Sequence, residues 1–310
     1  MLSSNALHPV QLNLTLLSSH SGSLQTLAIT LNSPVVHPDC LPTLKLPPEI
    51  NLTREVVLYG RSPTWLYGAL IHKCQAAPWL GCYDARSQAV IVIHSRVESP
   101  AIGDRLPVTL NRQPCPAILI GGPPNSGKSV LSNATRLSLT AQLPNDTIYL
   151  HRASWDGEGN WTYETAQPSF VEALVRNHEY RIHEDPETAK LIPGFFQSHA
   201  DAVANLRNLV DCLLVDVGGL PQREKVPLVE QCSHYMIISR LPEAVDVWHQ
   251  FCQPHLKPIA VIHSVLSDEF EVLQTTPWLE IKAGPWLMGA TQTIPDILLK
   301  HILNAIQQSP

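Results

Sequence analysis

The clearest chemical signal in this sequence is Gly122–Ser129, which reads G-x-x-x-x-G-K-S. This is the pattern of a phosphate-binding loop, or P-loop. An apolar run, Ala117–Ile120, precedes it, and a run typical of a helix, Ser129–Leu143, follows it. Backbone amides and a helix N-terminus would then form a cradle for phosphate groups. The pattern predicts that Lys128 binds the β and γ phosphates of ATP and that the Ser129 hydroxyl binds Mg²⁺.

Every residue of this motif is a candidate nucleotide-binding residue: Gly122, Pro123, Pro124, Asn125, Ser126, Gly127, Lys128 and Ser129. Asp216 ends a later apolar run, Leu213–Val217, and an acid at that place helps to hold Mg²⁺ in P-loop proteins. Ser129 and Asp216 are therefore the predicted metal ligands.

Asp156 follows the second predicted strand of the same region, in Asp156–Trp161. An acid there could serve as a base for a substrate hydroxyl, or position water, beside the bound nucleotide. An Asp-Gly turn explains the same residues equally well. Five arginines are candidates for the group that stabilises charge on the transferred phosphate, and the sequence does not rank them: Arg152, Arg181, Arg207, Arg223 and Arg240.

A second set of polar residues lies earlier in the chain. Gly60, Arg61, Ser62 and Pro63 combine a helix start with a guanidinium group, which suits a phosphodiester. Three further residues stand at predicted element ends: His72 ends a helix, while Asp84 and His94 end strands. Each also has a structural explanation, since such residues often occupy helix ends and turns.

In combination, these residues resemble the Csx-three family of CRISPR-associated ancillary proteins. The resemblance covers roughly residues 10–110, and its core is the block from Gly60 to Arg86. It implies a ring nuclease that cleaves cyclic oligoadenylate, in particular cyclic tetra-adenylate, held between copies of a homo-oligomer. It also implies Mn²⁺ at the nuclease site, catalytic roles for Asp84, His72 and Arg61, and ligand binding by Gly60, Arg61, Ser62, Pro63 and His94.

The sequence departs from the family pattern at Gln75, where the family has a catalytic histidine three residues beyond His72. A glutamine side chain does not exchange a proton as a histidine does near neutral pH. His72 or His94 would have to replace the missing histidine, or cleavage would be slow. The family's later histidine is displaced as well, since here His94 precedes Ser95.

The elements that must position these residues fall into two groups. Up to about residue 112, alternating strands at Gln11–Ser18 and Leu24–Leu31 precede a strand, a helix at Thr64–Cys74 and two more strands. We expect an α+β domain over residues 1–112. From residue 113 strands alternate with helices, which predicts an α/β P-loop NTPase domain with a mainly parallel sheet over residues 113–310. The resemblance implies that this second domain is of AAA type.

The C-terminal strands are predicted at Ala117–Ile120, Thr147–Leu150, Leu213–Val217, Tyr235–Ser239, Ile259–Ser264 and Leu279–Lys282. The helices are predicted at Ser129–Leu143, Ser169–His178, Ala200–Asn208, Val226–Cys232, Ala244–Cys252 and Ile294–Gln307.

The composition limits the possible partners. A formal net charge of −6 over 310 residues disfavours binding to long nucleic acids. No apolar run reaches the roughly 18 residues that span a bilayer, and we expect no membrane association. Seven scattered cysteines without a C-x-x-C pair indicate a reducing, cytoplasmic location.

Three functions remain open. The chain could be a ring nuclease whose ATP- and Mg²⁺-binding domain modulates oligomerisation or activity. It could instead be a P-loop nucleoside or nucleotide kinase with a regulatory N-terminal domain, in which Asp156 is the base. It could also be a sensor that binds cyclic oligoadenylate without cleaving it.

Overall fold

The fold was analysed in a computed structural model, which describes residues 8–19, 22–33, 35–110, 112–153, 189–289 and 291–308. The chain divides into two compact units, Met1–Asn111 and Arg112–Pro310. We refer to them as unit 1 and unit 2.

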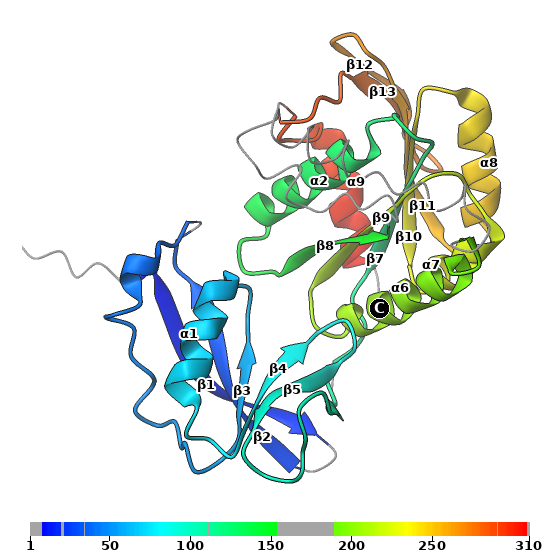
Figure 1. The fold of residues 1–310 in the computed structure, drawn as a ribbon. Coiled ribbons are helices and arrows are strands. Elements are labelled where there is room, and N and C mark those ends of the chain that lie inside the picture. The colour runs from blue at the N-terminus through cyan, green and yellow to red at the C-terminus, as the bar shows by residue number, and fades with distance from the viewer. Residues whose placement is uncertain are drawn as a thin grey trace, which may run out of the picture. The chain divides into compact units, whose positions relative to one another are not determined.

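Unit 1 contains a six-stranded sheet in the order β1-β2-β3-β4-β5-β6 (Figure 1). The β2-β3-β4 pairs are parallel, and the remaining pairs are antiparallel. Its elements are β1 (Val10–Ser19), β2 (Gly22–Leu31), η1 (Pro38–Cys40), β3 (Val56–Tyr59), α1 (Thr64–Cys74), β4 (Trp79–Asp84), β5 (Ala89–Ser95) and β6 (Arg105–Pro107).

Helix α1 connects the parallel strands β3 and β4, and it packs on one face of their sheet. Leu66 and Leu70 of α1 are fully buried in one cluster with Val56, Leu58 and Leu80 of the strands. This crossover places the N-terminus of α1 after the carboxyl end of β3, and the C-terminus of α1 before the start of β4. The N-terminus of α1 therefore lies at the edge of the sheet formed by the carboxyl ends of β3 and β4. Its C-terminus lies at the opposite edge, formed by the amino ends of these strands.

Unit 2 contains a seven-stranded sheet in the order β12-β13-β11-β10-β7-β9-β8. Only the β12-β13 pair is antiparallel. The strands are β7 (Ala117–Gly121), β8 (Ile148–Ala153), β9 (Cys212–Val217), β10 (His234–Ser239), β11 (Lys257–Ser264), β12 (Glu269–Gln274) and β13 (Leu279–Gly284).

Helices cover both faces of this sheet (Figure 1). One face carries α2 and α9, whose apolar side chains join a single core with alternate residues of the strands. The other carries α6, α7 and α8. The helical elements are α2 (Lys128–Gln142), α6 (Ile192–Arg207), η3 (Arg223–Lys225), α7 (Val226–Val229), α8 (Pro242–Cys252) and α9 (Asp296–Gln307). Among the described residues, none of the helices is long and apolar enough to cross a bilayer.

The α+β and mainly parallel α/β architectures agree with the sequence patterns. Strand β12 is not among the strands predicted from the sequence, although its first four residues alternate between polar (Glu269, Glu271) and apolar (Phe270, Val272) side chains. Most of its side chains are exposed in the folded unit. The helix expected at residues 169–178 lies outside the described residues. Strand β9 is directly hydrogen-bonded to β7.

A buried column of side chains connects the two loops that follow β7 and β9. Trp248 of α8 is fully buried, and a Cβ atom on Gly121 would lie 2.7 Å from its ring. The Lys225 ammonium lies 5.9 Å from the centre of the Trp248 ring and 5.5 Å from that of Phe196. The same ammonium donates hydrogen bonds to the carbonyl oxygens of Gly218, at 2.5 Å, and Leu220. Lys225 thereby ties residues 218–220 to the core beneath the P-loop.

We expect Gly60→Ala to destabilise unit 1, because Gly60 has φ +141° and a Cβ atom there would lie 2.3 Å from the Ile29 carbonyl oxygen. The cost should be roughly 1–3 kcal/mol. Gly68→Ala is the matched control, since nothing lies within 4 Å of its Cβ position in α1. It should stabilise by about 0.5–1 kcal/mol. Hydrogen exchange of peptides from residues 56–95 measures the stability of unit 1 in each variant. Equal protection in the two variants would contradict the prediction.

We expect Lys225→Met to lower the free energy of unfolding of unit 2 by roughly 2–4 kcal/mol, because the carbonyl groups of Gly218 and Leu220 lose the buried ammonium that donates to them. Lys257→Met is the control, since Lys257 is exposed at the start of β11 and should change stability by less than about 0.5 kcal/mol. Urea unfolding of both variants provides the measurement. Matching midpoints would show that the ammonium is not needed to hold residues 218–220.

Candidate functional site

The P-loop is formed where β7 leads into α2, as the sequence predicts. Gly127 precedes α2 with φ +89°, and a Cβ atom there would lie 2.7 Å from that of Trp286. A Cβ atom on Gly122 would lie 2.1 Å from the Ile238 carbonyl oxygen. Asn125 has φ +58°, a conformation that asparagine tolerates better than most residues. The loop therefore requires glycine at both ends of the motif for steric reasons.

The polar residues of the loop are largely enclosed. Lys128 is the first residue of α2 and is 9% exposed, and Ser126 is 3% exposed. The Ser126 Oγ atom is buried and has no hydrogen-bond partner among the described residues. Ser129 is half-buried in the first turn of α2. The loop thus presents an ammonium, two hydroxyl groups and a helix N-terminus, which together suit an anion.

Asp216 lies in the strand beside the P-loop strand, directly across from Ile120. Its side chain is 3% exposed. On the other side, Arg152 of β8 is its register partner, with Nη2 3.9 Å from Asp216 Oδ2. The carboxylate of Asp216 and the hydroxyl of Ser129 are oxygen donors of the kind that Mg²⁺ prefers. Arg152 adds a positive charge that balances the carboxylate.

The structure distinguishes between the candidate arginines. Arg207 holds backbone carbonyl groups, since Nε donates to Cys115 and Nη1 to Gln231, each at 2.7 Å. Arg223 is exposed in η3, and Arg152 faces Asp216. Arg240 follows β10 and lines a pocket next to the P-loop. Arg181 and the candidate base Asp156 lie outside the described residues.

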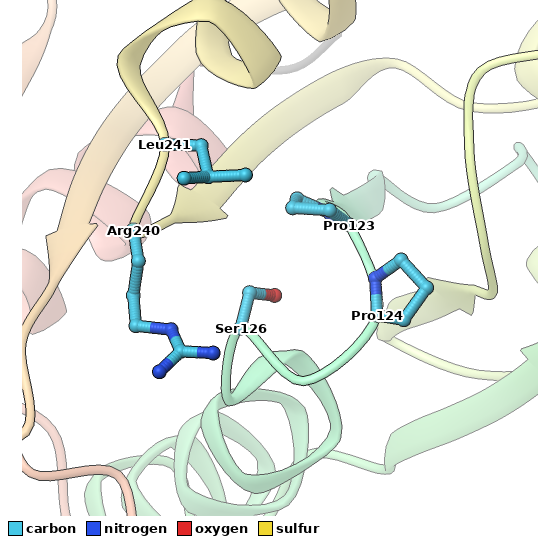
Figure 2. A pocket seen from close by; sticks show the side chains of 5 residues that line it. All are labelled: Pro123, Pro124, Ser126, Arg240 and Leu241. Atoms are coloured by element: carbon cyan, nitrogen blue, oxygen red, sulfur yellow. The ribbon is translucent and has the colours of Figure 1, made fainter.

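The pocket beside the P-loop has a volume of about 260 Å³. In Figure 2 the Arg240 side chain runs along one side of this pocket, and its guanidinium group points toward Ser126. Pro123, Pro124 and Leu241 complete its lining. The sequence pattern had not singled out this arrangement, because the two sides of the pocket are more than a hundred residues apart in the chain.

In unit 1, one group of predicted residues gathers at the carboxyl ends of β3 and β4. Gly60 follows β3 and is held there by its close approach to Ile29, and its carbonyl accepts a hydrogen bond from Tyr67 Oη at 2.7 Å. Arg61, Ser62 and Pro63 continue into the N-terminus of α1. The Ser62 Oγ atom is buried without a hydrogen-bond partner among the described residues.

Asp84 ends the neighbouring strand, at the same edge. Its carboxylate accepts hydrogen bonds from the Arg86 amide, at 3.2 Å, and from the Ser87 hydroxyl, at 2.6 Å. These bonds are those of a turn former. The adjacent Tyr83 packs edge-on against Tyr59, and burial together with the nearby Tyr59 and Asp84 raises the pKa of Tyr83 to about 12. Tyr83 remains a neutral phenol at this edge, a feature that the sequence did not indicate.

The two histidines lie at the opposite edge. His72 is exposed near the C-terminus of α1, beside the C-cap residue Gln75. His94 is the register partner of Leu80, near the start of β4, and its Nε2 atom is buried without a partner among the described residues. Asp84 lies four residues beyond Leu80 along β4, a rise on the order of 13 Å. Within one chain, the structure therefore places Arg61 and Asp84 at the same edge of the sheet and both histidines at the other.

Metal ligands do not cluster in the part of the chain that the structure describes. No group of three or more histidine, cysteine, aspartate or glutamate residues lies together there. All seven cysteines are free. Burial raises the pKa of the Cys74 and Cys82 thiols to about 11, so neither is a reactive thiolate at neutral pH.

Residues 29–107 match the family described as CRISPR-associated protein (Cas_csx3). This stretch includes the residues at both edges of the unit 1 sheet. A protein of Aquifex aeolicus (strain VF5) is 39% identical over 49 residues, which is 16% of this chain and 44% of that protein. The chain thus aligns with less than half the length of this relative, whose recorded name is "Uncharacterized protein".

Two solved structures are similar to this chain at low sequence identity. A plasmid partition protein of Borrelia burgdorferi B31, bound to AMPPNP, is 11% identical with a TM-score of 0.41, over 63% of this chain and 100% of that one. A ParA family ATPase from Chlorobium tepidum TLS is 12% identical with a TM-score of 0.36, over 63% and 93% of the two chains. The family match therefore lies within unit 1, whereas the P-loop lies in unit 2.

Proposed function

We propose that this protein is a ring nuclease that cleaves cyclic oligoadenylate, with a second unit that binds ATP and Mg²⁺. The observation that carries the proposal is the Cas_csx3 match over residues 29–107, the stretch that holds Arg61, Asp84 and both histidines. The complete P-loop beside the strand that holds Asp216 supports the ATP-binding part.

The proposed cleavage uses the ribose 2′-hydroxyl as nucleophile. Its oxygen attacks the neighbouring phosphorus, the bond to the 5′-oxygen breaks, and that oxygen takes up a proton. The reaction needs a base, a cation near the phosphoryl oxygens and an acid. Arg61 and the α1 amides suit the phosphoryl oxygens, while Asp84 and the histidines suit proton transfer.

The separation of these groups within one chain favours a site that two copies complete. The edge with Arg61 and Asp84 of one copy would face the edge with His72 and His94 of another. A ligand with repeated symmetry fits such a symmetric assembly. Mn²⁺, where it binds, would add positive charge at the phosphate, but the described residues of a single copy do not form a metal cluster.

A non-catalytic sensor is the second candidate, and Gln75 is the observation that favours it. This residue caps α1 at the position where the Csx-three pattern has a histidine. A sensor would bind the ring without opening it. The kinase alternative depends on Asp156, which lies outside the described residues.

We expect Lys128→Ala to weaken ATP binding at least about 100-fold, because an ammonium that contacts two phosphates contributes on the order of 3 kcal/mol. Lys300→Ala, an exposed lysine of α9, is the matched control and should bind as the wild type does. Titration with a fluorescent ATP analogue provides the measurement. Unchanged affinity in Lys128→Ala, with its melting temperature preserved, would refute ATP binding at the P-loop.

We expect Asp84→Asn and His72→Ala each to reduce cleavage of labelled cyclic tetra-adenylate at least about 100-fold. Asparagine retains an oxygen that accepts the turn hydrogen bond from Arg86. If two copies share the site, a 1:1 mixture of these variants should recover about a quarter of the wild-type rate, since half of the dimers hold one intact site.

A mixture of Asp84→Asn with Arg61→Ala is the matched control. Both changes affect the same edge, so every site in the mixed dimer carries one of them. Cleavage of cyclic tetra-adenylate should therefore not recover. Lack of recovery in both mixtures would reject the shared site. Tight binding of an unbroken ring by the wild-type protein would reject cleavage and support the sensor.

A further inference from the structure

We propose that Arg240 and Ser126 bind the terminal phosphoryl group of the nucleotide in the pocket beside the P-loop. This inference rests on the proposed ATP binding and deepens it, because it assigns the γ-phosphate to residues outside the usual lysine and serine of the motif.

The first argument is a shortage of backbone donors. P-loops cradle phosphates with main-chain N–H groups. In this loop the second and third residues are Pro123 and Pro124, and proline has no N–H group. After the Gly122 amide, the next amide donor of the loop is therefore that of Asn125, and the wall formed by the two prolines has none.

The second argument is the chemistry of the pocket at that wall. Its apolar lining comes from Pro123, Pro124 and Leu241, while its polar side chains are Ser126 and Arg240. The guanidinium is a donor with no acceptor, and the Ser126 hydroxyl can donate one proton. Arg240 thus brings a positive charge to the place where the loop lacks amide donors (Figure 2).

The third argument is the unsatisfied hydroxyl group of Ser126. Its side chain is 3% exposed, and its Oγ atom has no hydrogen-bond partner among the described residues. Buried hydroxyl groups are almost always hydrogen-bonded. An unpaired hydroxyl group that lines a pocket therefore indicates that a bound ligand supplies the acceptor. A phosphoryl oxygen provides one.

The fourth argument is size and position. The volume of about 260 Å³ is below the roughly 300–1,000 Å³ of pockets that enclose drug-sized ligands. It suits a phosphoryl group rather than a whole nucleotide. Arg240 comes directly after β10, whose Ile238 carbonyl packs against Gly122 at the start of the loop. The arginine is thereby held at a defined place beside the P-loop.

The test compares ATP with ADP in Arg240→Ala, Arg240→Lys and Ser126→Ala. Arg240→Ala should weaken binding of a non-hydrolysable ATP analogue about 10- to 100-fold, the range of a hydrogen bond to a charged group, and change ADP binding less than about twofold. Arg240→Lys should recover part of the loss, because the positive charge remains while the planar fork does not. Ser126→Ala should weaken binding of the ATP analogue by about threefold to tenfold.

Arg105→Ala, which removes an exposed arginine of β6 in unit 1, is the matched control and should bind both nucleotides as the wild type does. Equal weakening of ATP and ADP in Arg240→Ala, or no change in either, would overturn the assignment of the γ-phosphate. A wild-type protein that binds neither nucleotide would overturn the proposed ATP binding itself, so the two failures are distinguishable.

Discussion

The organisation of unit 2 depends on the close approach of the P-loop backbone to three neighbouring elements. Gly121 lies against the Trp248 ring, Gly122 against the Ile238 carbonyl and Gly127 against Trp286. At each position a Cβ atom would come within 3 Å of its neighbour, closer than packed atoms allow. These contacts hold the loop between β10, α8 and the segment after β13, where its residue Ser126 lines the pocket.

The same contacts connect the P-loop with the segment after β9. Trp248 lies between Gly121 and the Lys225 ammonium, and Lys225 holds the carbonyl groups of Gly218 and Leu220. A change in residues 218–220 on nucleotide binding would therefore have to displace a buried charge from its two acceptors.

In unit 1 the connection β3-α1-β4 decides which residues can act together. Arg61 and Asp84 both follow carboxyl ends of parallel strands, and such ends meet at one edge. His72 ends the helix and His94 pairs near the start of β4, so both belong to the other edge. A site that needs all four residues requires two copies, a requirement that agrees with the homo-oligomer implied by the family resemblance.

The sequence by itself determined the P-loop, the two architectures and most of the described strands and helices, because these follow from local spacing and apolar periodicity. It does not predict β12, and it places the start of α6 at Ala200 rather than at Ile192. It also indicated Arg61 and Asp84 through the Csx-three pattern. Only the tertiary structure separated the histidines from Asp84, because strand register decides which edge a residue occupies. Likewise, only the structure places Arg240 in one pocket with Pro123, Pro124 and Ser126, since β10 packs beside β7.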